Sequence, residues 1–97
     1  MLKAIEGWML TKHARDYGAS DSQDEELGIV FTIDEAKKML EKIASPLDTT
    51  CSPFEYGRSS YISPDCISID YTPCHKEKLP TIWVSAKKVN IAIEMKG

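Results

Sequence analysis

Cysteine and long apolar runs are both scarce in this chain of 97 residues. The three cysteines cannot all pair within one chain, so we expect reduced thiols and no disulfide framework. Lys3, Glu6 and Lys12 interrupt the apolar N-terminal segment, so we expect neither a signal peptide nor a membrane span there. These absences predict a soluble, cytoplasmic protein.

Positive charge is also limited. The net charge is −3, and only two of the twelve basic residues are arginines. The lysines are scattered among fifteen carboxylates and form no basic stripe. Direct binding to DNA or RNA is therefore disfavoured.

Motifs that would identify an enzyme are missing. We find no glycine-rich phosphate loop, no nucleophile elbow and no pair of catalytic carboxylates in a recognisable frame. The sequence therefore favours a protein that is not an enzyme and needs no cofactor.

The size and composition fit one compact domain spanning residues 1–97. Apolar residues make up 42% of the chain and charged residues 28%, which is an ordinary globular balance. A chain of this length builds one core, since two separate cores would both be too small.

The clearest local signal is the segment "FTIDEAKKMLEKIAS". Thr32 and Glu35 have the spacing of a capping box, and apolar residues then recur every three or four positions. This pattern predicts a helix that begins at Ile33. Ser45-Pro46 is expected to end it, because proline offers no amide hydrogen and restricts the residue before it.

Five segments have strand patterns. "AIEGWML" and "LGIVFT" precede the helix, and "DCISIDY", "PTIWVSA" and "KVNIAIEMK" follow it. The polar step at residues 86–88 is expected to join the last two as a hairpin. The resulting prediction is an α+β fold, with four or five antiparallel strands and one helix packed on one face of the sheet.

Two long connections remain, and each contains an arginine, a tyrosine and a glycine. The first, "HARDYGASDSQDEE", contains Arg15 and Tyr17, and residues 45–61 contain Tyr56 and Arg58. Arginine and tyrosine are common in binding loops, so one hypothesis places both loops beside one binding site, with Phe54 and Tyr61 completing it. In the alternative, the arginines are ordinary loop residues that pair with Asp16 or Glu55.

Cys51, Cys66, Cys74 and His75 are the candidate metal ligands. They lack the closely spaced Cys-x-x-Cys pair with which structural zinc sites usually begin, so we predict no metal site. A catalytic role for Cys51 with either histidine has no motif to support it.

The order of "EGWM", "ARDYG", "GIVF" and "TIDEAKKML" resembles the opening of small, mostly uncharacterised phage-encoded α+β proteins, over about the first forty-five residues. In those proteins the Ala-Arg-Asp stretch follows the tryptophan strand more closely than here. The resemblance implies a mobile-element origin and says nothing about mechanism.

The function expected from the sequence is therefore binding. The leading hypothesis is a protein that docks on a macromolecular partner, another protein, and inhibits or sequesters it; an inhibitor of a host system would suit the phage resemblance. The alternative is a small-ligand binder that can form a homo-oligomer, in which Arg15 and Arg58 hold an anionic or nucleotide-like molecule against Tyr17 or Tyr56.

Overall fold

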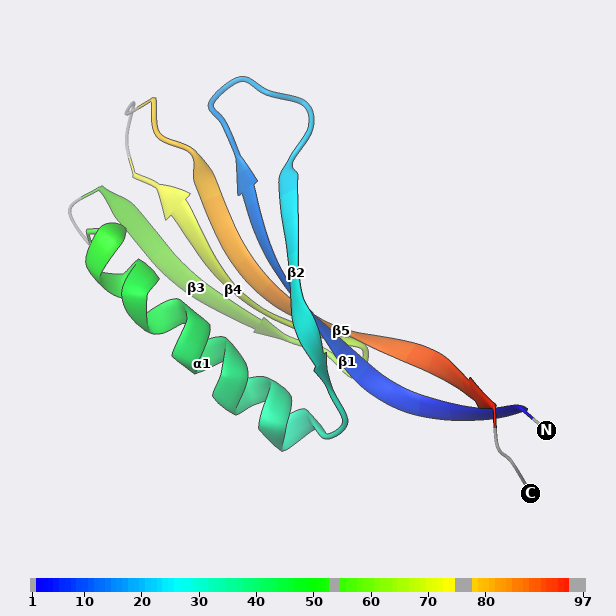
Figure 1. Ribbon diagram of the computed structural model, residues 1–97. Coiled ribbons are helices and arrows are strands. Elements are labelled where there is room, and N and C mark those ends of the chain that lie inside the picture. The colour runs from blue at the N-terminus through cyan, green and yellow to red at the C-terminus, as the bar shows by residue number, and fades with distance from the viewer. Residues whose placement is uncertain (1, 53–54, 75–77, 95–97) are drawn as a thin grey trace.

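A computed structural model describes residues 2–52, 55–74 and 78–94 of the chain. Within them, one antiparallel sheet has the strand order β2-β1-β5-β4-β3, and one helix lies along one of its faces (Figure 1). The predicted α+β class is confirmed. The elements are β1 (Leu2–Arg15), β2 (Gln23–Val30), α1 (Ile33–Thr50), β3 (Tyr56–Ile62), β4 (Cys66–Pro73) and β5 (Thr81–Glu94).

The core lies between α1 and the sheet. Residues paired directly across antiparallel strands point to the same face, so the register assigns each side chain to a face. Leu10, Val84 and Tyr71 point toward α1 and are almost fully buried. From the helix, four side chains fill the same core: Ala36, Leu40, Ala44 and Leu47.

The start of α1 agrees with the prediction. Thr32 is the N-cap, and its Oγ1 accepts a hydrogen bond of 3.1 Å from the backbone N–H of Glu35. Asp34 and Glu35 place negative charge in the first turn, where the helix dipole favours it.

The predicted end of the helix is wrong. α1 continues through Pro46 to Thr50. Leu47, which is 6% exposed, and Cys51, which is 4% exposed, are buried in the core beyond the proline. This burial offsets the missing N–H of Pro46, and the carbonyl left without that partner belongs to the exposed Lys42.

The two long loops are also shorter than predicted. Residues 45–50 belong to α1 and residues 56–61 belong to β3, so the expected irregular connection over 45–61 does not exist. On the other side, β1 extends to Arg15 and β2 begins at Gln23, which leaves a turn over residues 16–22. β3 shows no alternation of buried and exposed positions, because every residue after Tyr56 is exposed; the strand lies at the edge of the sheet and pairs with β4.

The predicted hairpin around residues 86–88 is wrong as well. β5 is one continuous strand of fourteen residues. The apolar positions change phase within it: Val84 and Ala86 face α1, whereas Val89 and Ile91 point to the other face. The alternation of apolar residues therefore changes phase, although the strand itself is continuous.

The phase change coincides with the end of the main sheet. β2 pairs with β1 only as far as Trp8, and β4 pairs with β5 only as far as Lys87. Beyond these points β1 and β5 continue as a two-stranded ribbon, residues 2–7 paired with residues 89–94, that projects from the domain (Figure 1). The molecule is accordingly elongated, with principal extents of 58 × 27 × 21 Å.

Candidate functional site

The face of the sheet opposite α1 carries a hydrogen-bonded histidine and a neighbouring apolar surface; we call it the open face. Among the described residues, no helix or strand packs on it. Its upper part, over the main sheet, is polar, whereas its lower part, at the base of the ribbon, is apolar. The two parts meet between Met9 and Thr11 on β1.

A chain of three hydrogen-bonded side chains occupies the polar part. His13 Nδ1 lies 2.6 Å from Asp24 Oδ1, and His13 Nε2 lies 3.0 Å from Ser85 Oγ. The antiparallel pairing places these side chains together: β1 pairs His13 with Asp24 on β2, and with Trp83 on β5, two residues before Ser85. The Trp83 ring stacks on the imidazole, with centroids 4.8 Å apart and planes 13° apart.

The partners of His13 define the roles of its two nitrogens. An ionised aspartate only accepts hydrogen bonds, so Nδ1 carries the proton and donates to Asp24. In the neutral imidazole, Nε2 is then the acceptor for the Ser85 hydroxyl. Ser22 Oγ also donates to Asp24 Oδ1, at 2.9 Å, and so helps to hold the carboxylate in place.

This arrangement makes a prediction about acid stability. Hydrogen bonds from His13 and then from Ser22 hold the pKa of Asp24 below its ordinary value. A depressed folded-state pKa stabilises the fold above the ordinary aspartate range, near pH 4, and that contribution is lost as pH falls through the lower folded-state value. We expect Asp24→Asn to flatten the decline in stability below about pH 4, measured as urea midpoints against pH. Asp21→Asn, in the exposed turn, is the control and should leave the wild-type decline unchanged; identical profiles for both variants would contradict the assignment.

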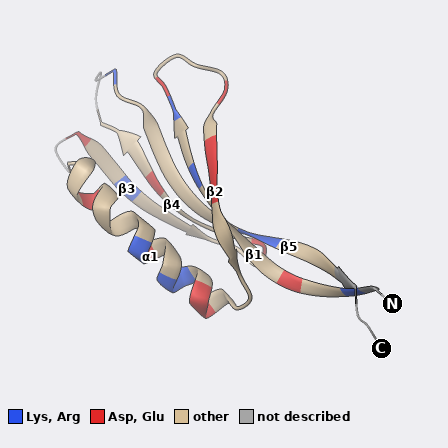
Figure 2. Cartoon of the chain, in the orientation of Figure 1, with Lys and Arg blue, Asp and Glu red and all other residues tan. Residues whose placement is uncertain are grey.

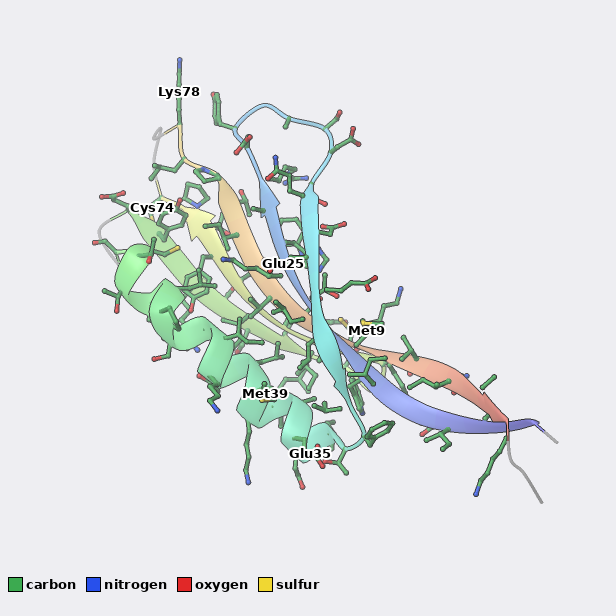
Figure 3. The ribbon with its side chains drawn as sticks, in the orientation of Figure 1. Met9, Glu25, Glu35, Met39, Cys74 and Lys78 are labelled. Carbon is green, nitrogen blue, oxygen red and sulfur yellow. The ribbon has the colours of Figure 1, made fainter. Side chains whose placement is uncertain are left out.

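The apolar part of the open face surrounds Gly7. A Cβ atom built there would lie 3.0 Å from Ile91 Cδ1 and 3.1 Å from Ile29 Cγ2, so the absence of a side chain lets these two isoleucines close over the strand. We call the surrounding surface the apolar patch. Figure 3 labels Met9, which lies where the ribbon leaves the sheet. The apolar patch consists of Ile5, Met9, Ile29, Val89 and Ile91.

Arg58 is engaged within the protein. It lies on β3 on the helix-covered face, where its Nη2 contacts Glu41 Oε2 at 3.1 Å and its Nε contacts Asp48 Oδ1 at 3.2 Å. Its Nε also donates to the Tyr71 hydroxyl at 3.4 Å, and this bond, with the neighbouring carboxylates, raises the pKa of Arg58. Arg58 thus pairs with carboxylates, as in the alternative interpretation of the sequence, but its partners lie on α1 and not in its own segment.

The two arginines do not share a surface. Arg58 pairs with Tyr71, Tyr71 with Ile82, and Ile82 with Ala14, so these four side chains point to the helix-covered face. Arg15 follows Ala14 and therefore points to the open face. Three strand spacings of about 4.8 Å separate β1 from β3 as well. The hypothesis that Arg15 and Arg58 flank one site is wrong.

The other predicted binding residues are dispersed. Tyr17 is 67% exposed in the turn over 16–22, and together with Arg15 it lines a hollow of about 310 Å³ near Leu79. Tyr56 is buried, and its hydroxyl donates to the Pro80 carbonyl at 2.9 Å. Tyr61 is 58% exposed on the open face of β3, and Phe54 lies outside the described residues.

The cysteines do not form a cluster. Cys51 is buried beneath the end of α1, and burial, followed by the charge of Asp48, raises the pKa of its thiol, which keeps it protonated. Across the described ranges, no group of three or more histidine, cysteine, aspartate or glutamate side chains is placed to bind a metal ion. His75 lies outside those ranges.

Sequence reasoning missed His13, Asp24 and Ser85 as a group. His13 and Ser85 are 72 positions apart, and only the β1–β5 register brings them together. The alternation within β5 gives the face of Ser85, but nothing local indicates which residue of β1 lies opposite.

Comparison of the chain with protein-family models, with curated proteins and with solved structures gave no match. Among the described residues, no helix is both long enough and apolar enough to cross a membrane.

Proposed function

We propose that the protein is a small binding protein that docks on another protein and blocks or sequesters it by binding alone, with no catalytic step on that partner. The observation that supports this proposal best is the apolar patch on the open face. Ile29 within it is 40% exposed and its other four residues are half-buried, while Leu27 and Phe31 nearby on the chain are 39% and 57% exposed. Exposed apolar surface that gathers in one place commonly marks an interaction site.

The ribbon adds a second argument. Within the described part of the chain, residues 2–7 of β1 pair with β5 on one side and with no strand on the other. The unpaired side is the one along which β2 pairs with β1 as far as Trp8. An isolated two-stranded ribbon is only marginally stable in water, and free strand edges readily accept an added strand. The edge of β1 beside the apolar patch is therefore suited to a strand from a partner.

The partner that fits is an extended segment with apolar residues at alternate positions. Its backbone would pair with the edge of β1, and every second side chain would lie on the apolar patch beside Ile29 and Ile91. β2, which leads up to this position, carries acidic residues and no lysine or arginine, as Figure 2 shows. Basic residues at the end of the segment that approaches β2 would therefore add to the attraction.

The alternative of an anionic ligand held by two arginines lacks support, since Arg58 is paired with Glu41 and Asp48 on the other face of the sheet. The resemblance to phage proteins makes bacterial host proteins the first class of partner to test. Inhibition by docking requires no catalytic group in the site.

A pair of edge-strand variants tests the proposal. We expect Ile29→Lys to abolish the specific recovery of a partner from a bacterial lysate, because it places a charge within the apolar patch. Tyr61→Lys is the matched control, since Tyr61 is also exposed on the open face of an edge strand but lies on β3. The measurement is quantitative mass spectrometry of proteins retained by each variant.

Hydrogen exchange of the recovered complex gives a second measurement. Amides of residues 2–7 should become protected on binding, whereas those of β3 should not. If both variants retain the same proteins as wild type, or if wild type retains nothing specific, the proposed surface is wrong.

A further inference from the structure

The Asp24–His13–Ser85 chain has an arrangement that goes beyond protein binding. A serine hydroxyl is activated as a nucleophile when a histidine accepts its hydrogen bond and a carboxylate orients that histidine. The distances here, 3.0 Å for Ser85 to His13 and 2.6 Å for His13 to Asp24, meet the hydrogen-bonding reach that such a group needs. The geometry is recognised by roles in space and needs no sequence motif.

We propose that Ser85 is a nucleophile that takes an acyl group from small esters with good leaving groups, with His13 as its general base and Asp24 as the residue that positions His13.

The imidazole is held before any substrate arrives. Trp83 stacks on one side of the ring, Asp24 fixes Nδ1, and Ser22 in turn holds Asp24. The His13 side chain is only 19% exposed, which limits the conformations it can reach. A base that is oriented in this way loses little entropy when it takes the proton of Ser85.

The chemical step is an ordinary acyl transfer. Ser85 Oγ forms a bond to the ester carbonyl carbon as its proton moves to His13 Nε2, and Asp24 stabilises the resulting imidazolium. When the tetrahedral intermediate collapses, the bond to the leaving alkoxide breaks and that oxygen takes the proton from Nε2. The acyl group then remains on Ser85 until water, deprotonated by His13, releases it as a carboxylic acid.

The position of Ser85 sets limits on this reaction. Ser85 lies in a central strand and pairs with Thr11 on one side and Ser68 on the other, so the strand amides around it serve the sheet and do not form an oxyanion hole. Because the residue is 9% exposed, only a small group can approach it. We therefore expect acylation to be slow and the acyl group to persist.

The charges near His13 are balanced. Asp24 approaches from β2, Arg15 lies two residues along β1 on the same face, and Asp70 on β4 pairs with Trp83. Lys87 lies two residues beyond Ser85 on β5 and also points to the open face. Glu26, which pairs with Thr11 on the same face, adds a third carboxylate, so the charges of this face favour an uncharged ester.

Ser68 provides an internal control. It pairs directly with Ser85 across β4 and β5, so both hydroxyls lie on the open face one strand apart. Its Oγ donates to Asp70 Oδ2 at 3.4 Å, and within residues 2–52, 55–74 and 78–94 no hydrogen bond joins it to a histidine. A reagent that merely reacts with accessible serines would modify Ser68 at least as readily as Ser85.

A fluorophosphonate probe tests the proposal, because it reacts with activated serines by the same attack and stays attached. The Oγ–P bond forms, the P–F bond breaks, and fluoride leaves while the proton goes to His13. We expect the labelled residue, located by peptide mass spectrometry, to be Ser85 and not Ser68.

Two variants test the roles of the partners. His13→Phe keeps an aromatic ring beside Trp83 but removes the base, and it should slow labelling of Ser85 by at least about 100-fold. Asp24→Asn should also slow labelling, because the amide favours the wrong tautomer of His13. Asp24 is 53% exposed, so this second variant is expected to fold, which circular dichroism checks. Equal labelling of Ser85 and Ser68, or an unchanged rate in folded Asp24→Asn, would overturn the proposal.

Discussion

Replacement of Tyr71 with phenylalanine is expected to destabilise the protein by about 2 kcal/mol, because it removes a buried hydroxyl that joins three elements. Tyr71 is 1% exposed on β4. Its hydroxyl donates to Asp48 Oδ1 at 2.5 Å, lies 3.2 Å from the Ala44 carbonyl oxygen and accepts from Arg58 Nε on β3 at 3.4 Å. The variant keeps the ring and therefore isolates the loss of these bonds, which the urea midpoint measures.

Tyr61→Phe is the control, since its side chain is 58% exposed and the change should alter stability by less than about 0.5 kcal/mol. Equal midpoints for the two variants would mean that the Tyr71 hydroxyl forms hydrogen bonds with water in the unfolded chain that are as strong as those in the folded protein.

Tyr71 should also make the stability of the fold decrease at alkaline pH. Burial, and then the hydrogen bond to Asp48, raises the pKa of Tyr71 to about 12. The folded state thus holds the phenolic proton more tightly than the unfolded state, in which the pKa is near 10. The stabilisation is complete below about pH 10 and is lost as pH rises toward 12, by about 3 kcal/mol in total. Tyr71→Phe should lack this part of the decline, which urea midpoints between about pH 9 and 12 would measure.

The parts of the fold that the sequence predicted depend on local interactions. The helix begins at Ile33 because the Thr32 hydroxyl caps the amide of Glu35 three residues on, and both partners are visible in the sequence. β4 was visible because Ile67, Ile69 and Tyr71 alternate with polar residues over the core. In each case, the residues that determine the structure lie within one short segment.

The errors arose where distant residues decide the outcome. β3 has no apolar alternation, and its place at the edge depends on pairing with β4. β5 was divided because its apolar residues change face at Lys87, where the helix no longer covers the strand. Neither the pairing nor the extent of helical cover can be read from the segment itself.

The candidate site was harder still to predict. Arg58 attracted attention as a rare arginine, yet its position on β3 directs it to Glu41 and Asp48 on α1. His13 and Ser85 have no distinctive neighbours in the sequence and meet through strand register alone. Composition therefore indicated which residues were unusual, and tertiary structure decided which of them lie together.

The proline within α1 leads to the second large effect, which is a gain in stability. Pro46 lies inside the helix, where proline costs about 3 kcal/mol relative to alanine. Proline also restricts the unfolded chain, which stabilises the native protein by about 1 kcal/mol, and the alanine variant loses this contribution. We therefore expect Pro46→Ala to stabilise the protein by about 2 kcal/mol, observed as a higher urea midpoint with an unchanged slope.

Pro64→Ala is the matched control, because Pro64 lies in the connection between β3 and β4, where its fixed φ suits a turn. That variant should lose up to about 1 kcal/mol, so the two proline replacements have opposite signs.

The gain at Pro46 requires α1 to continue beyond residue 45, which the burial of Leu47 at 6% exposure also demands. Leu47→Ala should therefore cost at least about 2 kcal/mol. Loss of stability in Pro46→Ala, together with a neutral Leu47→Ala, would instead place the end of the helix at Ser45, where the sequence alone suggested it.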